Sequence, residues 1–328
     1  MVNTPDPRSA QVEVLGPLDP DEVRAVADLV EAATEADGVR PLSEHVMLHL
    51  RYGGDDPVRN VLVYSDGELA AYGHLDVTDE VEGASAEVVV HPSHRRRGFG
   101  RLLVQATLDE TPDGRLRLWA HGGHAGAAAL ARSMGFRASR ALLQLRRSLY
   151  APLPAPVIPS GVTVRTFEPG RDDEAWVRLN AAAFRDHPEQ GSWTVHDLHR
   201  RLREPWFDPA GFFLAERDGR LVGFHWTKVH GGNGTQHPEG PHAHEGHGHD
   251  PIGEVYVVGV DPGEQGTGLG KAITLTGLRH LRHLGLGSAM LFVEADNTAA
   301  IGLYTALGFT RWETDLMFSR DTSSAEAP

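Results

Sequence analysis

Two short glycine-containing segments of this chain repeat one pattern in the same surroundings. Residues 95–100 and 265–270 both read Gln/Arg-x-x-Gly-x-Gly, and each follows an apolar run that ends in a proline, Pro92 or Pro262. Each segment also opens a stretch with the apolar spacing of a helix. A strand, a glycine loop and a helix N-terminus form an anion site, because inward N–H groups and the helix end attract negative charge. The sequence therefore predicts two phosphate-binding units.

The repetition extends well beyond the loops. An Asp-Gly pair between two apolar runs precedes each loop, at 66–67 and at 218–219, and this order predicts a β-hairpin. Downstream, residues 129–136 resemble residues 302–309. The repeat is too long for a solenoid and each copy is large enough for its own core. We therefore predict a tandem of whole domains.

A proline-dense run separates the two copies. Residues 151–161 carry four prolines between small and apolar residues, which is typical of an extended linker. The predicted organisation is an N-terminal domain at 1–150, a linker at 151–161 and a C-terminal domain at 162–328.

Composition excludes several classes of function. Hydrophobic residues make up 40% of the chain and charged residues 23%, as in soluble globular proteins. The chain has neither a long apolar span nor an N-terminal signal pattern, so we expect a cytoplasmic, monomeric protein with no membrane partner. Cysteine is absent, which excludes disulfides and a cysteine nucleophile. A net charge of −14 argues against a nucleic-acid partner.

These motifs resemble a known family. The two loops, with Asn297 and then Tyr304 before Gly308-Phe309, resemble the GCN5-related N-acetyltransferases (GNAT). The tandem arrangement and the segments 223–230, 253–257 and 293–297 are similar to the mycothiol synthase family. The resemblance implies an α/β fold of two tandem GNAT-like domains, each a twisted mixed β-sheet flanked by helices. It also implies acetyl transfer from acetyl-CoA to the cysteinyl amine of a cysteinyl-glucosamine-inositol conjugate, a small-molecule amine, in mycothiol biosynthesis.

Two residues carry the chemistry that this reaction needs. Making an amide from a thioester requires a neutral amine and a proton for the leaving thiolate. Glu254 begins the strand before the second loop, where a carboxylate can take the ammonium proton, directly or through a water. Tyr304 follows Asn297 on the next helix and is a suitable acid. A solvated strand-end charge and a packed aromatic are the alternatives, but the two together favour catalysis.

The first copy lacks both residues. When the copies are aligned on the proline after the strand, Ala84 takes the place of Glu254. When they are aligned on Gly-Phe, Ala131 takes the place of Tyr304. We therefore predict that the N-terminal domain is not catalytic, although it keeps a phosphate loop.

The resemblance also assigns binding residues. The residues implied to bind acetyl-CoA are Val88, Val89, Val90, Arg96, Arg97, Gly98, Phe99, Gly100 and Arg101 in the first half, and Val258, Gly259, Val260, Gln265, Gly266, Thr267, Gly268, Leu269, Gly270, Lys271, Asn297, Thr298, Ala299, Ala300, Ile301 and Gly302 in the second. The residues implied to contact the acceptor are Glu44, Glu189, Lys228, Glu254 and Phe292. Phe292 replaces a tyrosine that is frequent in the family, so a hydroxyl contact is lost there.

Histidines are dense in an insertion of the second half, at residues 230–250. Alternating histidines can bind zinc or nickel, but a glycine-rich loop offers no second layer of contacts to orient them. We predict no functional metal site.

Two other functions fit parts of the pattern. A tandem acetyltransferase for another amine, such as an aminoglycoside or a protein N-terminus, keeps Glu254 and Tyr304 without Glu44, Glu189 and Lys228 converging. A non-catalytic sensor of acetyl-CoA needs neither Glu254 nor Tyr304.

Overall fold

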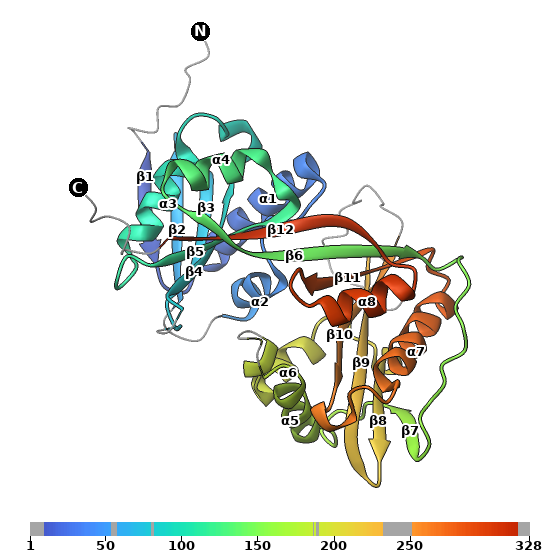
Figure 1. Cartoon of the computed structure of the whole chain (residues 1–328). Coiled ribbons are helices and arrows are strands. Elements are labelled where there is room, and N and C mark those ends of the chain that lie inside the picture. Colours follow the sequence, from blue (N-terminus) through green and yellow to red (C-terminus); the bar gives the residue numbers. More distant parts are fainter. Residues whose placement is uncertain are drawn as a thin grey trace, which may run out of the picture. The chain divides into compact units, whose positions relative to one another are not determined.

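The computed structural model describes residues 10–53, 58–79, 82–185, 187, 190–231 and 251–320. The chain forms two compact units (Figure 1). Unit 1 comprises Met1–Leu143 and Glu313–Pro328, and unit 2 comprises Gln144–Trp312. Among the described helices, none has the length and apolar character that crossing a membrane requires.

Unit 1 is built on a mixed sheet. Its strands follow the order β1-β2-β3-β4-β5-β12. The β4–β5 pair is parallel, and the pairs β1–β2, β2–β3, β3–β4 and β5–β12 are antiparallel. The strands are β1 (Gln11–Leu15), β2 (Val58–Ser65), β3 (Glu68–Asp76), β4 (Ala84–Val90), β5 (Leu116–Ala120) and β12 (Thr310–Arg320).

Helices cover both faces of this sheet. They are α1 (Pro20–Asp37), α2 (Glu44–Tyr52), α3 (Phe99–Asp109) and α4 (Ala125–Ser133). An Asp19–Glu22 capping box starts α1, whose apolar stripe packs with α2 on the face that carries Tyr72 and Val89. On the other face Leu103 of α3 packs against the sheet. The core of unit 1 therefore has two apolar layers, one on each side of the sheet.

Unit 2 repeats this plan. Its strand order is β6-β11-β10-β9-β8-β7, with β10 and β11 parallel. The strands are β6 (Arg137–Ser148), β7 (Val162–Thr166), β8 (Phe212–Arg217), β9 (Arg220–His230), β10 (Ile252–Val260) and β11 (Ser288–Glu294). The helices are α5 (Asp173–Ala183), α6 (Val195–Leu202), α7 (Leu269–His283) and α8 (Thr298–Ala306).

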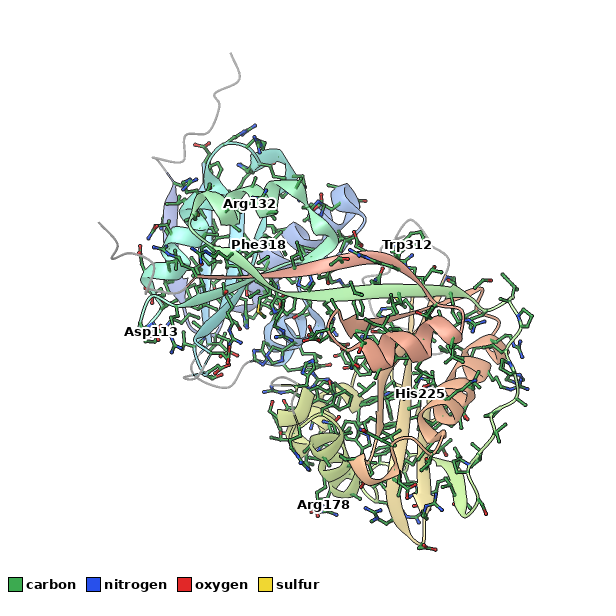
Figure 2. The ribbon with its side chains drawn as sticks, viewed as in Figure 1. Asp113, Arg132, Arg178, His225, Trp312 and Phe318 are labelled. Carbon is green, nitrogen blue, oxygen red and sulfur yellow. The ribbon has the colours of Figure 1, made fainter. Side chains whose placement is uncertain are left out.

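The two faces of the unit 2 sheet differ in character. Trp176 of α5 packs in a dense aromatic cluster against Phe224 and Trp226 of β9. On the opposite face, aliphatic side chains of α7 pack against β9 and β10. His225 of β9, labelled in Figure 2, is fully buried on this face and is bonded through Nδ1 to the carbonyl of Ile273 in α7. The mixed, helix-flanked sheets predicted from the sequence are confirmed.

The predicted hairpins are also present. Asp66 and Gly67 join β2 to β3 with φ of 54° and 84°, and Asp218 and Gly219 join β8 to β9 with φ of 51° and 74°. Two successive residues with positive φ are the mark of the type I′ turn that an Asp-Gly pair favours.

The limits of the units differ from the predicted domains at 1–150 and 162–328. Residues 313–328 belong to unit 1, because Leu316–Arg320 of β12 pair antiparallel with Leu116–Ala120 of β5. Phe318 of β12 lies in the apolar core of unit 1 (Figure 2). Conversely, β6 begins in unit 1 and ends in unit 2. Each sheet is thus completed by a strand from the other sequence repeat.

The proline-rich run at 151–161 does not separate the units. It has almost no regular structure, as predicted, but it lies within unit 2. Leu153 is 7% exposed and its carbonyl accepts a hydrogen bond from Arg279 of α7. The chain passes from unit 1 to unit 2 within β6, ahead of the run.

Candidate functional site

The two glycine loops have the same backbone. Gly98 and Gly268 cap α3 and α7 with φ of 96° and 88°, and neither helix start receives a side-chain capping bond. Two residues earlier, Arg96 and Gly266 also have positive φ, of 63° and 80°. Left-handed residues at alternate positions turn successive N–H groups toward one side. Both loops are thus shaped to hold an anion at a helix N-terminus.

The residues expected to bind acetyl-CoA lie on the segments that the sequence suggested. In unit 1 they occupy the end of β4, the loop and the first turn of α3, and in unit 2 the end of β10, the loop and the first turn of α7. Asn297 caps α8, where its side chain accepts a bond of 3.0 Å from the N–H of Ala300. Arg95 is a bidentate partner of Asp37, at 2.6 and 2.7 Å.

Three residues predicted to act on the acceptor share one face of the unit 2 sheet. Glu254 of β10 pairs directly with Lys228 of β9, and on the other side it pairs in parallel with Met290 of β11. Phe292 lies two residues beyond Met290, so it points to the same face. This is the face covered by α5 and α6. The ladder therefore brings Lys228, Glu254 and Phe292 to one side of the sheet.

A β-bulge follows Glu254. The register of β9 with β10 shifts between Val255 and Val257, which leaves Tyr256 as the extra residue. Bulges turn side chains to new directions and are frequent next to active sites. Here the bulge directs the Tyr256 ring toward Lys228, and its hydroxyl accepts a bond of 2.8 Å from Arg201 of α6.

Glu254 at the start of β10 and the facing Lys228 at the end of β9 are both largely buried. Glu254 is 7% exposed and Lys228 is 8% exposed. The Lys228 ammonium lies 4.3 Å from the ring centre of Trp206 and 5.1 Å from that of Tyr256. The sequence analysis placed His230 at the start of the histidine-rich insertion and gave it no role beside Glu254, yet its Nε2 lies 2.6 Å from Oε2 of Glu254. Its place two residues beyond Lys228 on the same strand was the available signal.

Tyr304 lies on α8 with 7% of its surface exposed, and its ring packs against Phe309. Burial raises the pKa of Tyr304 to about 12. The phenol therefore keeps its proton at neutral pH, and it can donate a hydrogen bond to an electron-rich group.

Comparison with known proteins identifies this architecture. The model of the acetyltransferase (GNAT) family matches residues 25–136 and 175–309, once in each sequence repeat. The chain belongs to this family. It is therefore an acetyltransferase, and proteins of the family generally take the acetyl group from acetyl-CoA.

Several relatives of this acetyltransferase carry one name. The chain is 56% identical to the mycothiol acetyltransferase of Streptosporangium roseum, covering 95% of this chain and 100% of that one. It is 57% identical to the mycothiol acetyltransferase of Acidothermus cellulolyticus, with 96% of each chain covered. Among solved structures, the tandem GNAT protein from the clavulanic acid biosynthesis pathway matches 98% of the chain with a TM-score of 0.70 at 20% identity. That likeness shows a tandem GNAT fold.

The structure aligns the two copies of the acetyltransferase more closely than the sequence could. Glu254 pairs with Lys228, and the matching ladder position in unit 1 joins Ser85 to Asp76. The bulge in β10 adds one residue, so Ser85 and not Ala84 corresponds to Glu254. The match of Ala131 with Tyr304 is confirmed by equivalent bonds of 3.0 Å from the N–H groups of Phe136 and Phe309 to their carbonyls.

The other two residues predicted to contact the acceptor, Glu44 and Glu189, do not lie on this sheet face of unit 2 among the described residues. Glu44 is the first residue of α2 in unit 1, directly after the cap residue Ser43. Glu189 and residues 232–250 of the histidine-rich insertion lie outside the described residues. Within the described part of the chain, no group of three or more histidine and acidic side chains could hold a metal ion.

Unit 1 has a buried ionic cluster where unit 2 is apolar. Glu87 takes the ladder position of Val257, and it accepts a bond of 2.5 Å from the N–H of Ser43. His121 lies 3.6 Å from Glu87 and 3.0 Å from Asp315 of β12. Burial opposes a charge on His121, but the two carboxylates outweigh it and raise the pKa of His121 to about 10. The cluster is therefore a buried cation between two anions.

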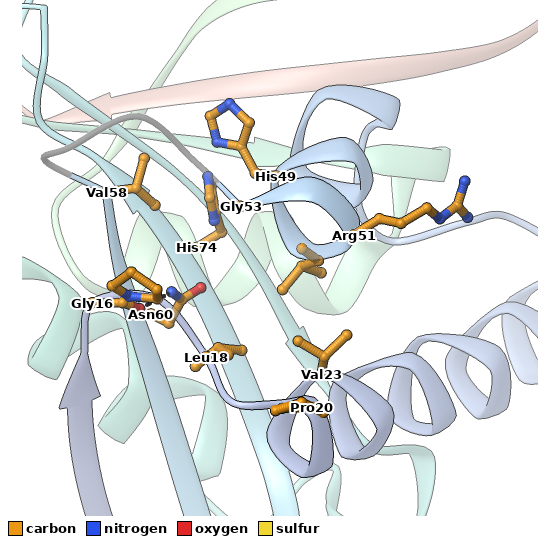
Figure 3. A pocket seen from close by; sticks show the side chains of 12 residues that line it. Gly16, Leu18, Pro20, Val23, His49, Arg51, Gly53, Val58, Asn60 and His74 are labelled. Atoms are coloured by element: carbon orange, nitrogen blue, oxygen red, sulfur yellow. Dashed lines mark hydrogen bonds between the residues drawn. The ribbon is translucent and has the colours of Figure 1, made fainter. Parts of the chain in front are cut away.

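Unit 1 also contains a cavity of about 350 Å³ (Figure 3). It is lined by the end of α2, the start of β2 and His74 of β3, and by none of the residues predicted to bind acetyl-CoA. His74 is 3% exposed, and neither ring nitrogen has a hydrogen-bond partner among the described residues. Burial lowers the pKa of His74 to about 4, so the ring is neutral.

Proposed function

We propose that this acetyltransferase moves the acetyl group of acetyl-CoA to the cysteinyl amine of a cysteinyl-glucosamine-inositol conjugate and so forms mycothiol. The supporting relatives are 50–57% identical over nearly the whole chain and carry the name mycothiol acetyltransferase. The observation that carries the chemical part is the buried Glu254 at the start of the strand that leads into the unit 2 glycine loop. The proposal includes the monomeric state and the cytoplasmic location expected from the sequence.

Glu254 is the proposed general base. An ammonium group is not nucleophilic, so one proton must leave before the amine attacks the thioester carbonyl. A carboxylate within the face of a sheet, opposite the Lys228 ammonium, is fixed in place and exposed to little water. The carboxylate takes the proton from the acceptor nitrogen either directly or through one bridging water.

Tyr304 is the proposed acid. Its pKa of about 12 lies above that of an ordinary thiol, about 8.5, so complete proton transfer to the thiolate is uphill. A hydrogen bond donated to the developing negative charge on sulfur does not need complete transfer. Tyr304 thus stabilises the leaving group, and the thiolate takes its proton from this bond or from water.

The unit 2 loop holds the pyrophosphate of acetyl-CoA in this proposal. Its support is the pair of left-handed residues Gly266 and Gly268, which leave the backbone open on the side of the helix end. Unit 1 has the same loop, but Ser85 and Ala131 stand where unit 2 has its base and its acid. Unit 1 therefore binds the cofactor without reacting.

The acceptor is a small polar amine in the proposal. Lys228 and Phe292, together with Glu44 and Glu189, are the residues assigned to hold it, by resemblance to the family. Lys228 can donate hydrogen bonds to hydroxyl or carbonyl oxygens, and its position over two aromatic rings fixes its direction.

A direct assay tests the proposal. Release of free CoA is measured with acetyl-CoA and a panel of amines: the conjugate, an aminoglycoside and a peptide with a free N-terminus. The conjugate is expected to give the highest kcat/KM, because only it satisfies the polar groups of the site. Preference for another amine favours the second tandem acetyltransferase function. Binding of acetyl-CoA with no release for any amine favours the sensor.

A further inference from the structure

His230 and Glu254 are diagonal neighbours on one face of the unit 2 sheet. His230 is the last residue of β9 and pairs with Ile252, two residues before Glu254 on β10. Diagonal side chains on a sheet face are close enough for a long side chain to meet another. The Nε2 atom of His230 and Oε2 of Glu254 do so at 2.6 Å, a short hydrogen bond to a charged group.

The proposed reaction releases one proton in each turnover. An ammonium and a thioester give an amide and a thiol: R–NH₃⁺ + CoA–S–COCH₃ → R–NH–COCH₃ + CoA–SH + H⁺. The nitrogen loses two protons in forming the amide, and the thiolate sulfur takes up one. The second proton must leave the site, because a base that stays protonated cannot serve the next acceptor.

Glu254 is poorly placed to release that proton by itself. Its side chain is 9% exposed, and its partner across the ladder, Lys228, is an ammonium that has no lone pair to accept a proton. The side chain of His230 is 35% exposed. An imidazole can accept a proton at one nitrogen and release another from the opposite nitrogen. The ring thus connects a buried carboxylate with solvent.

We propose that His230 carries the proton from Glu254 to solvent, an inference that rests on the proposed function. At rest the ring donates its Nε2–H to the carboxylate, and exchange with water moves this proton to Nδ1, so that Nε2 offers a lone pair. The proton that Glu254 takes from the ammonium then passes to Nε2, which restores the carboxylate and leaves an imidazolium. The N–H bond at Nδ1 then breaks and that proton enters water. His230 touches neither the acceptor nor the cofactor in this proposal. It acts on the reaction only through Glu254, which it holds in position and from which its ring carries the proton away.

Unit 1, which has no counterpart of the base Glu254, also has no counterpart of His230. Ser85 and Asp76 hold the ladder positions of Glu254 and Lys228 in unit 1. The residue two positions beyond Asp76 is Thr78, where unit 2 has His230 two positions beyond Lys228. A threonine cannot take up a proton at neutral pH. The base and its proton carrier are thus absent together from unit 1.

The test uses steady-state turnover of the full chain with acetyl-CoA and the conjugate. His230→Ala is expected to lower kcat by about 10- to 100-fold, the scale of losing one proton-transfer group, with KM for acetyl-CoA unchanged. Added imidazole is expected to raise the rate of His230→Ala with concentration, because it replaces the missing ring. It should leave Glu254→Gln slow, since that variant lacks the first acceptor.

The His230→Gln variant distinguishes proton transport by His230 from a role in which His230 only holds Glu254 in place by a hydrogen bond. Glutamine can keep a hydrogen bond to Oε2 of Glu254 but cannot carry a proton, so this variant is expected to stay slow. His199→Ala is the matched control, because His199 forms a bond of the same 2.6 Å length with Asp173 in unit 2. It should turn over like the wild type.

The outcomes are distinguishable from failure of the proposed function. Wild-type turnover by His230→Gln, or a His230→Ala rate that does not respond to imidazole, overturns proton transport by His230. If His230→Ala does not fold by circular dichroism, His230→Gln alone decides. A wild-type chain that releases no CoA with the conjugate refutes the proposed acceptor, and undiminished turnover by Glu254→Gln refutes the proposed base.

Discussion

Lys228 and Glu254 are direct partners across the β9–β10 ladder, and both are more than nine-tenths buried. Opposite charges at directly paired positions of a ladder attract one another, which offsets part of the cost of taking both side chains out of water. This pairing lets the site keep a carboxylate base within a sheet face that otherwise carries the aromatic cluster of Trp206, Trp226 and Tyr256.

Replacement of the base tests the chemical step. Glu254→Gln is expected to lower kcat by about 10²–10⁴-fold with little change in KM for acetyl-CoA, because the amide has the shape of the carboxylate but takes no proton. Steady-state kinetics with the conjugate measures both constants. Ser85→Ala changes the matching position of unit 1 and should leave both unchanged. A Glu254→Gln chain as fast as the wild type would assign the base elsewhere.

Removal of the neighbouring charge tests acceptor binding. Lys228→Met keeps the aliphatic length over the Trp206 and Tyr256 rings but removes the ammonium. We expect acceptor binding to weaken by about 1–3 kcal/mol, the scale of one charged hydrogen bond, as a higher KM for the conjugate. Lys271→Met, in the predicted cofactor segment, should instead raise KM for acetyl-CoA. An unchanged acceptor KM in Lys228→Met contradicts the assigned role.

A large side chain in each glycine loop tests which loop serves the reaction. Gly268 has a φ of 88° and open space in front of its Cα, so Gly268→Trp places an indole where the pyrophosphate is expected. Turnover should fall below detection, whereas Gly98→Trp in unit 1 should leave most of it. Kinetics, with circular dichroism to verify folding, measures the effect. Equal losses in both variants would mean that unit 1 takes part in catalysis.

The ionic cluster of unit 1 predicts a pH dependence of stability. The pKa of His121 is about 10 in the folded chain and 6.5 ordinarily, so the protonated ring stabilises the fold fully below about pH 6.5. That contribution is lost as pH rises through about 10. His121→Gln should lower the free energy of unfolding by about 3–5 kcal/mol at pH 7, because two buried carboxylates lose their cation.

Urea unfolding at pH 7 and at about pH 11 measures this. The difference between wild type and His121→Gln should shrink at the higher pH. His124→Gln is the control, because the side chain of His124 is 41% exposed and its pair with Asp37 is worth at most about 1 kcal/mol. A constant difference between wild type and His121→Gln across this range would contradict the charged ring.

Local patterns were enough to predict the loops and the hairpins. Asp218-Gly219 and Gly266-x-Gly268 need only their own backbone preferences to form. The bulge at Tyr256 was not predictable, because an extra residue in a strand becomes visible only against its partner strand. Because of this extra residue, the residue of unit 1 that corresponds to Glu254 is Ser85 and not Ala84. The place of β12 was missed for the same reason, since Phe318 is equally apolar in either sheet.

The path of β12 has a consequence for how the chain matures. Residues 313–320 complete the unit 1 sheet beside β5, yet a ribosome makes them only after all of unit 2. Until then β5 has an open edge, and Asp315 has not reached His121. The sheet of unit 1 therefore cannot be completed until synthesis has passed unit 2, so an early stop within unit 2 leaves both units unfinished.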